Sequence, residues 1–113
     1  MTTKTNLYMA HAILLADIIN YVSKHSLSIY DIKCDLKDQV FIYHMTCCKS
    51  GHDEDILQKN IYDFNNLFNE ANIFINVESI TNNKTGYFIK LYFVIDKNTN
   101  LNLINTLLRL YKV

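Results

Sequence analysis

The chain has 113 residues, eleven basic and eleven acidic side chains, a hydrophobic content of 50%, two glycines and no proline. This length suits a single domain over residues 1–113, and the composition excludes an intrinsically disordered chain, which needs low hydrophobicity and high net charge. The zero formal charge also argues against a dedicated nucleic-acid binder, because phosphate neutralisation requires a surplus of Lys and Arg.

The first predicted element is a helix over about residues 7–24. Its polar positions Asp17, Asn20 and Lys24 recur at spacings of three and four and form a narrow stripe, whereas the rest is mostly apolar. A surface helix usually has one apolar face, so we expect this helix either at the centre of the domain or against a partner. The stretch is too short for a membrane span and lacks the basic start and cleavage site of a signal peptide.

Two strands are expected next, over residues 30–36 and 40–47. In the first, Tyr30 and the apolar residues at every second position after it alternate with charged side chains, which is the period of a half-buried strand. In the second, apolar residues occupy both faces, most clearly in its first half. The link over residues 35–39 is polar enough for a turn, although it lacks the Gly or Asn that a tight hairpin prefers.

The second predicted helix has an acidic start. Ser50 and Asp53 form a partial capping box, and apolar residues then recur at spacings of three and four as far as Ala71. The helix dipole favours acidic residues at this end, so we interpret the run 53–55 as structural rather than as an acid–base or cation site.

Two further strands and a last helix complete the chain. Residues 73–77 alternate as a third strand, residues 82–86 carry the strongest hairpin signal, and residues 87–95 form a fourth strand that is apolar on both faces. Asn98 or Thr99 is expected to cap the last helix. Its apolar stripe comprises Leu101, Ile104, Leu108 and Tyr111. The predicted fold class is α+β, an antiparallel sheet of about four strands packed with three helices in the order α-β-β-α-β-β-α.

The densest group of reactive side chains is His44-x-x-Cys47-Cys48-x-x-x-His52. His and Cys are ligands that zinc prefers, but adjacent cysteines on a strand point to opposite faces, and the spacing lacks the regularity of structural zinc sites. We therefore expect no metal and no cofactor, with Cys34 and Cys47 as small core residues and both histidines exposed. The chain has no glycine-rich phosphate loop and no nucleophile elbow, so it is not expected to be an enzyme.

Cysteine and codon usage bear on the compartment and the source. The three cysteines are an odd number and two are adjacent, which argues against a disulfide framework and predicts a cytoplasmic protein. Ile and Asn each occur fourteen times and Arg once, a bias typical of a low-GC genome such as that of a virus or a host-restricted bacterium. Because codon supply explains part of the Tyr and Asn content, single residues of these types carry little functional weight.

The most informative feature is a surplus of apolar surface. The first helix is apolar nearly all round, and the second and fourth strands are apolar on both faces, so helices on one side of the sheet would leave its other face in water. The expected function is therefore a small non-enzymatic protein-binding module, an adaptor, inhibitor or secretion-chaperone-like protein, that binds another protein or itself as a homodimer. The candidate contact residues are Ile42, Phe88, Tyr92 and Val94 on the sheet, and Tyr8, Leu15 and Val22 on the outer side of the first helix.

Two other classes of function stay open. The first is a regulatory nucleic-acid-binding protein, against which the neutral charge argues. The second is a zinc- or cysteine-dependent enzyme built on His44, Cys47, Cys48 and His52. The order of elements resembles that of type III secretion chaperones and of roadblock-type scaffolds, in order alone and without a shared motif.

Overall fold

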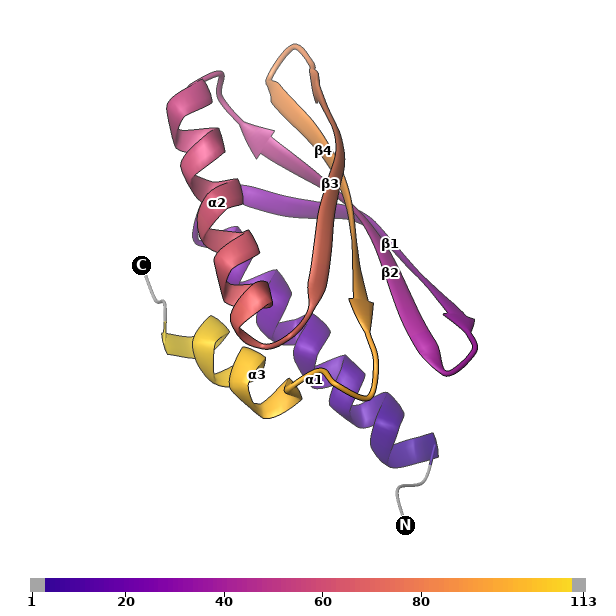
Figure 1. The fold of residues 1–113 in the computed structure, drawn as a ribbon. Helices are drawn as coiled ribbons and strands as arrows, with labels where there is room; N and C mark the ends of the chain where they lie inside the picture. The colour runs from indigo at the N-terminus through magenta and orange to yellow at the C-terminus, as the bar shows by residue number, and fades with distance from the viewer. Residues whose placement is uncertain (1–3, 111–113) are drawn as a thin grey trace.

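The computed structural model describes the backbone of residues 4–110 and the side chains of residues 9–110, so Tyr111 and the side chain of Tyr8 lie outside the described residues. Seven elements follow one another in the predicted order (Figure 1). They are α1 (Lys4–Ser23), β1 (Leu27–Lys37), β2 (Val40–Ser50), α2 (Glu54–Glu70), β3 (Phe74–Asn82), β4 (Gly86–Ile95) and α3 (Leu101–Leu110). The prediction of an α+β fold with a four-stranded antiparallel sheet is confirmed, and the strand order is β1-β2-β4-β3.

The two central strands join two similar halves of the chain. β2 and β4 run antiparallel with Met45 opposite Leu91, and each is paired on its other side with the first strand of its own hairpin. Ser26 and Asn72, which follow α1 and α2, both have a φ of 60° and are as far apart in the sequence as Met45 and Leu91. An approximate twofold axis through the Met45–Leu91 pair therefore relates α1-β1-β2 to α2-β3-β4.

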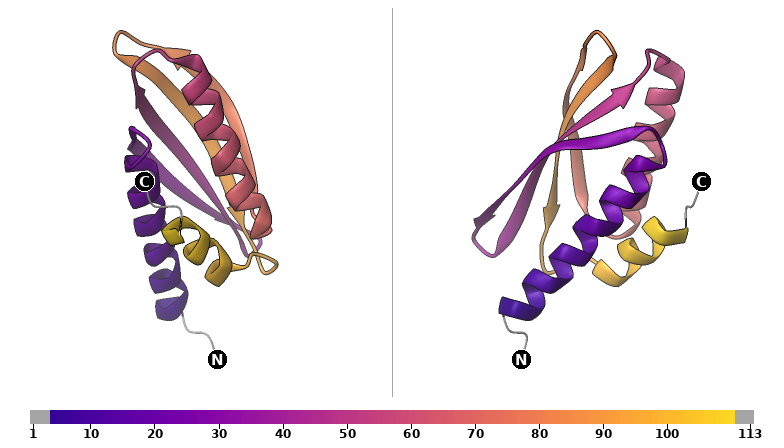
Figure 2. Two further views of the ribbon diagram at one scale, coloured as in Figure 1. Left: turned by 90° about the vertical axis from the view of Figure 1, so that its left-hand side faces the viewer. Right: turned by 180° about the vertical axis from the view of Figure 1, so that it is seen from behind.

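All three helices lie on one face of the sheet, and the opposite face is left open (Figures 1 and 2). The apolar sides of the helices and the inward-facing residues of β2 and β4 form one buried cluster, which includes Leu14, Ile18, Met45, Phe64, Phe68, Phe93 and Ile104. None of the helices in the described part of the chain is long and apolar enough to cross a membrane.

The two hairpins turn by different means. Asp38 and Gln39 connect β1 to β2, and both adopt positive φ values, 52° and 65°, which is the geometry of a two-residue type I′ turn. This turn forms without the Gly or Asn that favours it, so two other residues adopt a left-handed backbone conformation that is unfavourable for them. In the second hairpin the side chain of Asn83 accepts hydrogen bonds from the amides of Thr85 and Gly86 at 2.9 and 2.8 Å, as its turn signal leads one to expect.

The start of α2 differs from the predicted capping box. Asp53 is the N-cap, and its carboxylate accepts a hydrogen bond from the Ile56 amide at 3.1 Å. Ser50 takes no part because β2 extends as far as this residue, where it pairs with Gly86. The acidic run is thus explained by helix capping and the helix dipole.

The start of α3 also differs from the prediction. Asn100 caps this helix through a hydrogen bond that its side chain accepts from the Leu103 amide at 3.0 Å. Thr99, one of the two alternative caps predicted with Asn98, instead accepts a hydrogen bond from the Asp96 amide at 3.0 Å and closes the preceding turn. The competition between neighbouring short polar side chains decides this boundary.

Candidate functional site: the open face of the sheet

The open face of the sheet carries every second residue of each strand. Along β2 and β4, buried residues alternate with less buried ones. Because successive side chains of a strand point to opposite faces, the buried residues face the helices and the others face away from them. The sheet therefore presents the four predicted sheet residues on the face that no described helix covers. The side chains of the two central strands on this face are Ile42, His44, Thr46, Cys48, Phe88, Lys90, Tyr92 and Val94.

One apolar cluster lies at the end of the sheet near the β1–β2 turn. Val94 sits between Ile42 on β2 and Phe74 on β3 in the strand pairing. The rings of Phe74 and Tyr92 are 5.8 Å apart, and the ring of His44 is 6.0 Å from that of Tyr92 on the other side. This first cluster brings together three of the four predicted sheet residues.

A second, smaller apolar cluster lies at the other end of the open face. Phe88 pairs with Cys48, and its ring lies 6.0 Å from that of Tyr30 at an angle of 69°. Between the two clusters Lys90 pairs with Thr46 on one side and Ser79 on the other. The predicted sheet residues thus divide into two patches separated by a polar band, and the approximate twofold axis relates the two patches.

Sequence reasoning missed two of the most exposed aromatic residues on this face. Tyr30 is 73% exposed and Phe74 is 54% exposed. Alternation in the sequence assigned Tyr30 to the same side as Ile32, but a β-bulge between Ile29 and Asp31 reverses its direction. A bulge adds a residue without a distinctive sequence pattern, so periodicity alone does not reveal it.

The outer side of α1 differs from its prediction. Val22 is only 2% exposed and belongs to the core, so the prediction that it lies on the outer side is wrong. Leu15 is half-buried and packs against the core. The exposed apolar residues are instead Met9, Ile13 and Ile19, because the polar position Asp17 turns inward to bind Arg109 of α3 at 3.0 Å.

The structure does not bring the zinc candidates together. His44 and Cys48 lie on the open face, Cys47 is buried on the helix-covered face, and the ring of His52 lies 2.9 Å from the Asn83 carbonyl oxygen. Among the described residues no group of three or more His, Cys, Asp or Glu side chains is arranged to hold a metal ion. Cys34 is exposed rather than a core residue, since the hairpin carries it beyond the cover of the helices.

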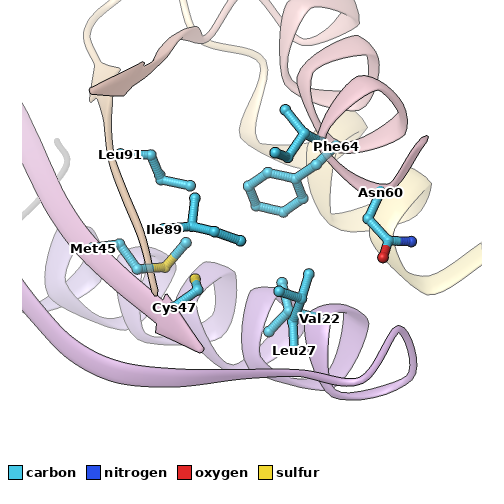
Figure 3. Close-up of a pocket in the computed structure, with 9 residues that line it drawn as sticks. Val22, Leu27, Met45, Cys47, Asn60, Phe64, Ile89 and Leu91 are labelled. Atoms are coloured by element: carbon cyan, nitrogen blue, oxygen red, sulfur yellow. The ribbon is translucent and has the colours of Figure 1, made fainter. Parts of the chain in front are cut away.

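A small hollow between the sheet and the helices is lined in part by Cys47 (Figure 3). It holds about 20 Å³, room for one water molecule, and its lining is apolar apart from Asn60. Burial raises the pKa of the Cys47 thiol to about 12, with a smaller contribution from Cys48, so this thiol stays protonated at neutral pH. The hollow is too small for a substrate, and its thiol is a packing group.

His11 and Tyr43 form a buried polar pair beneath α1 that sequence reasoning also missed. The Tyr43 hydroxyl lies 2.5 Å from Nδ1 of His11, whose ring packs edge-on against Phe41. Burial lowers the pKa of His11, which favours the neutral ring, and the Nδ1 atom of a neutral ring protonated at Nε2 accepts a hydrogen bond from the Tyr43 hydroxyl. Burial raises the pKa of Tyr43, and neighbouring Cys34 raises it further. The pair therefore ties α1 to β2 in its uncharged form.

No protein-family model, curated protein or solved structure matches this chain. What the chain does is therefore inferred from its own residues. Two apolar surfaces are not covered by any described part of the chain. They are the open face of the sheet, with its two aromatic clusters, and the exposed side of α1.

Acidification is expected to destabilise the protein. Burial lowers the pKa of both His11 and His25 below the ordinary value of 6.5, and neighbouring Lys49 adds to the effect on His25. As the pH falls below that value the unfolded chain binds protons that the folded chain excludes, so the free energy of unfolding decreases by at most about 1.4 kcal/mol per pH unit for each histidine. Urea denaturation over a pH series from about 7 to about 5 measures this slope.

The variant His11→Phe identifies how much of that slope His11 supplies. It keeps a ring against Phe41 and removes the titrating group, so its free energy of unfolding is expected to vary less with pH than that of the wild type, whatever its absolute value. His52→Gln, which removes an exposed histidine, is the control. An unchanged slope in His11→Phe would show that the His11–Tyr43 pair is not linked to folding through its proton.

Proposed function

We propose that the chain is a small non-enzymatic protein-binding module, an adaptor, inhibitor or chaperone-like protein, that acts through its open sheet face and associates as a homodimer. The single observation that carries this proposal is the apolar, aromatic surface on the face opposite the helices. Exposed apolar patches of this kind on a small protein mark interaction surfaces, because leaving them in water opposes stability and solubility.

The composition of the open face supports a protein as its partner. Aromatic side chains are enriched in protein interfaces because they bury a large area with few rotatable bonds, and Tyr also offers a hydroxyl. Tyr92 lies between Phe74 and His44, so its ring is already held in place before a partner arrives. Preorganised aromatic groups of this kind lose little conformational entropy on binding.

The exposed stripe on α1 is the second surface in this proposal. Met9, Ile13 and Ile19 are 58%, 43% and 50% exposed, and half-buried Leu15 lies beside them on the same helix. Met9 and Ile13 are four residues apart, as are Leu15 and Ile19, so each pair is adjacent on the surface of the helix. We place this module in the cytoplasm, a location that the three free cysteines support.

One alternative has an observation in its favour. Proteins that bind single-stranded nucleic acids stack bases on exposed aromatic residues of a sheet, and the open face has such residues. The charges around them argue against this role, since the lysines of this face (Lys33, Lys37 and Lys90) are accompanied by Asp31 and Asp35, which leaves no strong basic surplus. A complex with a single-stranded oligonucleotide that tightens steeply as salt is lowered would favour the alternative over the proposal.

Tyr92→Glu is expected to weaken partner binding by at least about tenfold, because it places a charge at the centre of the first apolar cluster. The tagged chain and the variant are used to capture proteins from the native host, and the captured partner is then titrated against each. Tyr62→Glu is the matched control, since Tyr62 is 66% exposed on α2, on the opposite side of the molecule from the open face.

The control decides what a loss of binding means. The proposal requires Tyr92→Glu to lose the partner while Tyr62→Glu retains it, with both variants showing the wild-type circular dichroism spectrum. If Tyr92→Glu binds the partner as tightly as the wild type, the open face is not the binding surface. Leu15→Glu applies the same test to α1.

A further inference from the structure

The outer edge of β1 is one of the two edges of the sheet. β1 is an end strand, so within the described residues one side of it has no neighbouring strand. From Lys33 to Lys37 the side chains are exposed on both faces, including Leu36 at 63%. Figure 1 shows this part of the β1–β2 hairpin projecting to the side, away from α2 and α3. A long exposed edge of this kind is a template for pairing with another strand.

Charged residues occupy every second position along this edge, and their signs alternate. Asp31, Lys33, Asp35 and Lys37 pair with consecutive alternate residues of β2 and so lie on one face of the sheet. The residues between them are Ile32, Cys34 and Leu36, which lie on the other face. The pattern reads the same from both ends with the signs exchanged, with Cys34 at its centre.

We propose that β1 pairs with β1 of a second copy in an antiparallel, twofold-symmetric dimer whose axis passes between the two Cys34 residues. In this register Asp31 lies opposite Lys37 of the second copy, and Lys33 lies opposite Asp35. Each pair occurs twice by symmetry, so all eight charges face an opposite charge. The two four-stranded sheets join into one continuous sheet, with the open faces of both copies on the same side.

The charges select this register over its neighbours. Pairing in a sheet keeps faces matched only if the register shifts by two residues at a time. A shift in one direction places Asp31 opposite Asp35 and Lys33 opposite itself. A shift in the other direction places Lys33 opposite Lys37 and Asp35 opposite itself. Both neighbouring registers therefore bring like charges together, which opposes pairing.

The other face of the same strand is complementary in a second way. Ile32 lies opposite Leu36 of the second copy, so the dimer covers the exposed Leu36 side chain with an apolar neighbour. The existing contacts of the charged residues are weak and exposed: Lys33 Nζ is 4.0 Å from Asp31, and His44 Nε2 is 3.4 Å from Asp35. These side chains can therefore turn to the second copy at little cost.

The other edge of the sheet lacks these features. β3 is interrupted by a bulge between Val77 and Ser79, and its only charged residue is Glu78 at that bulge. The bulge of β1 lies before Asp31, so the whole segment that pairs in the dimer is regular. We therefore assign the dimer contact to β1 rather than to β3. This inference rests on one part of the proposed function, the association of the chain as a homodimer.

Complementary charge variants test the pairing directly. Lys33→Asp places two carboxylates opposite each other, and Asp35→Lys places two ammonium groups opposite each other, so each variant alone is expected to dimerise more weakly than the wild type by about tenfold or more. When the two variants are mixed, every charge again faces an opposite charge. In sedimentation, each single variant is expected to be monomeric by itself, and the mixture of the two is expected to contain heterodimers. The double variant Lys33→Asp/Asp35→Lys is expected to form homodimers again.

Cys34 reports the position of the axis. In a Cys48→Ser background Cys34 is the exposed thiol and Cys47 is buried, so dibromobimane, which fluoresces on joining two nearby thiols, is expected to link two chains through Cys34. The same chain with Cys34→Ser is the control. Circular dichroism verifies that each variant is folded, which is expected because all substituted side chains except half-buried Cys48 are exposed.

Three results would overturn this dimer, and each contradicts a different part of it: self-association, its location on β1, or its register. A wild-type chain that is monomeric at about 100 µM would end both this dimer and the self-association in the proposed function, and would leave the open face to a different protein. A dimer that persists in both single variants would keep self-association but place it elsewhere. Failure of the mixed variants to form heterodimers would exclude this register.

Discussion

Phe93→Ala is expected to lower the free energy of unfolding by about 3–5 kcal/mol, the largest effect of any single truncation considered for this chain. Phe93 is fully buried near the C-terminal end of β4. Its ring stacks on Tyr43 with 5.1 Å between the ring centres and meets Phe68 of α2 edge-on, also at 5.1 Å. Removing the ring leaves a cavity between the sheet and the helices, which the surrounding residues of two strands and a helix cannot fill by small shifts.

Phe74→Ala is the matched control for this prediction. Phe74 is on the neighbouring strand but lies on the open face, 54% exposed, so its removal is expected to cost less than about 1 kcal/mol. Urea denaturation of both variants gives the comparison. If the two substitutions cost the same, the helices do not pack on the face of the sheet that carries Phe93. If Phe74→Ala also impairs partner binding, its role is in the interface.

The order of the elements was predictable because each one is encoded by a local pattern. The amphipathic spacing from Leu57 to Phe68 defines α2, and the alternation in β1 and in β3 defines strands, in each case within one short window. The strong turn signal around Asn83 places the second hairpin. None of these inferences needs a contact between distant parts of the chain.

The features that sequence reasoning missed depend on distant contacts or on single-residue shifts. The central pairing of β2 with β4 joins residues such as Met45 and Leu91, and no local pattern specifies which strands are neighbours. The bulge at Tyr30 changes the direction of one side chain by the insertion of one residue. The caps Asp53 and Asn100 are each chosen among several neighbouring polar residues.

The candidate site was predicted in part for the same reasons. Ile42, Tyr92 and Val94 were assigned to one face by alternation, and the structure places them together. For α1 a nearly uniform apolar sequence contains too little contrast to show which side faces the sheet. Val22 is therefore predicted on the wrong side. Half-buried Asp17 marks the inward direction only through its contact with Arg109, which the sequence does not reveal.

The two similar halves of the chain meet at the pairing of β2 with β4, so close packing at this junction is expected to matter for stability. β2 and β4 form the only strand pairing between the α1-β1-β2 and α2-β3-β4 halves in the described chain, since β1 and β3 each pair with one strand of their own half. One end of this junction is tight. Gly86 pairs with Ser50, and the amide of the next residue, Gly51, donates a hydrogen bond to the Thr85 carbonyl at 2.8 Å.

Gly86→Ala is accordingly expected to be the second most damaging substitution, with a loss of about 1–3 kcal/mol or more in the free energy of unfolding. A Cβ atom at this position would lie 1.8 Å from the backbone oxygen of Lys49 and 3.0 Å from that of Gly51. Both are backbone atoms of the β2 end, so β2 and β4 must separate there to admit a methyl group. Hydrogen exchange at the Gly51 amide measures this separation in addition to denaturation.

Gly51→Ala is the control that distinguishes crowding from backbone strain. Gly51 has a φ of +85°, which disfavours any side chain, but no atom lies within 4 Å of the position a Cβ would take. Its replacement is expected to cost only about 1–2 kcal/mol, from the left-handed backbone alone. Hydrogen exchange is compared at the amides where β2 and β4 meet. Faster exchange there in Gly86→Ala than in Gly51→Ala would show that Gly86→Ala loses stability because the two strands separate. Equal tolerance of both alanines would mean that a close approach of β2 and β4 at this end does not help to hold the two halves together, and that the rest of the β2–β4 pairing and the core join them.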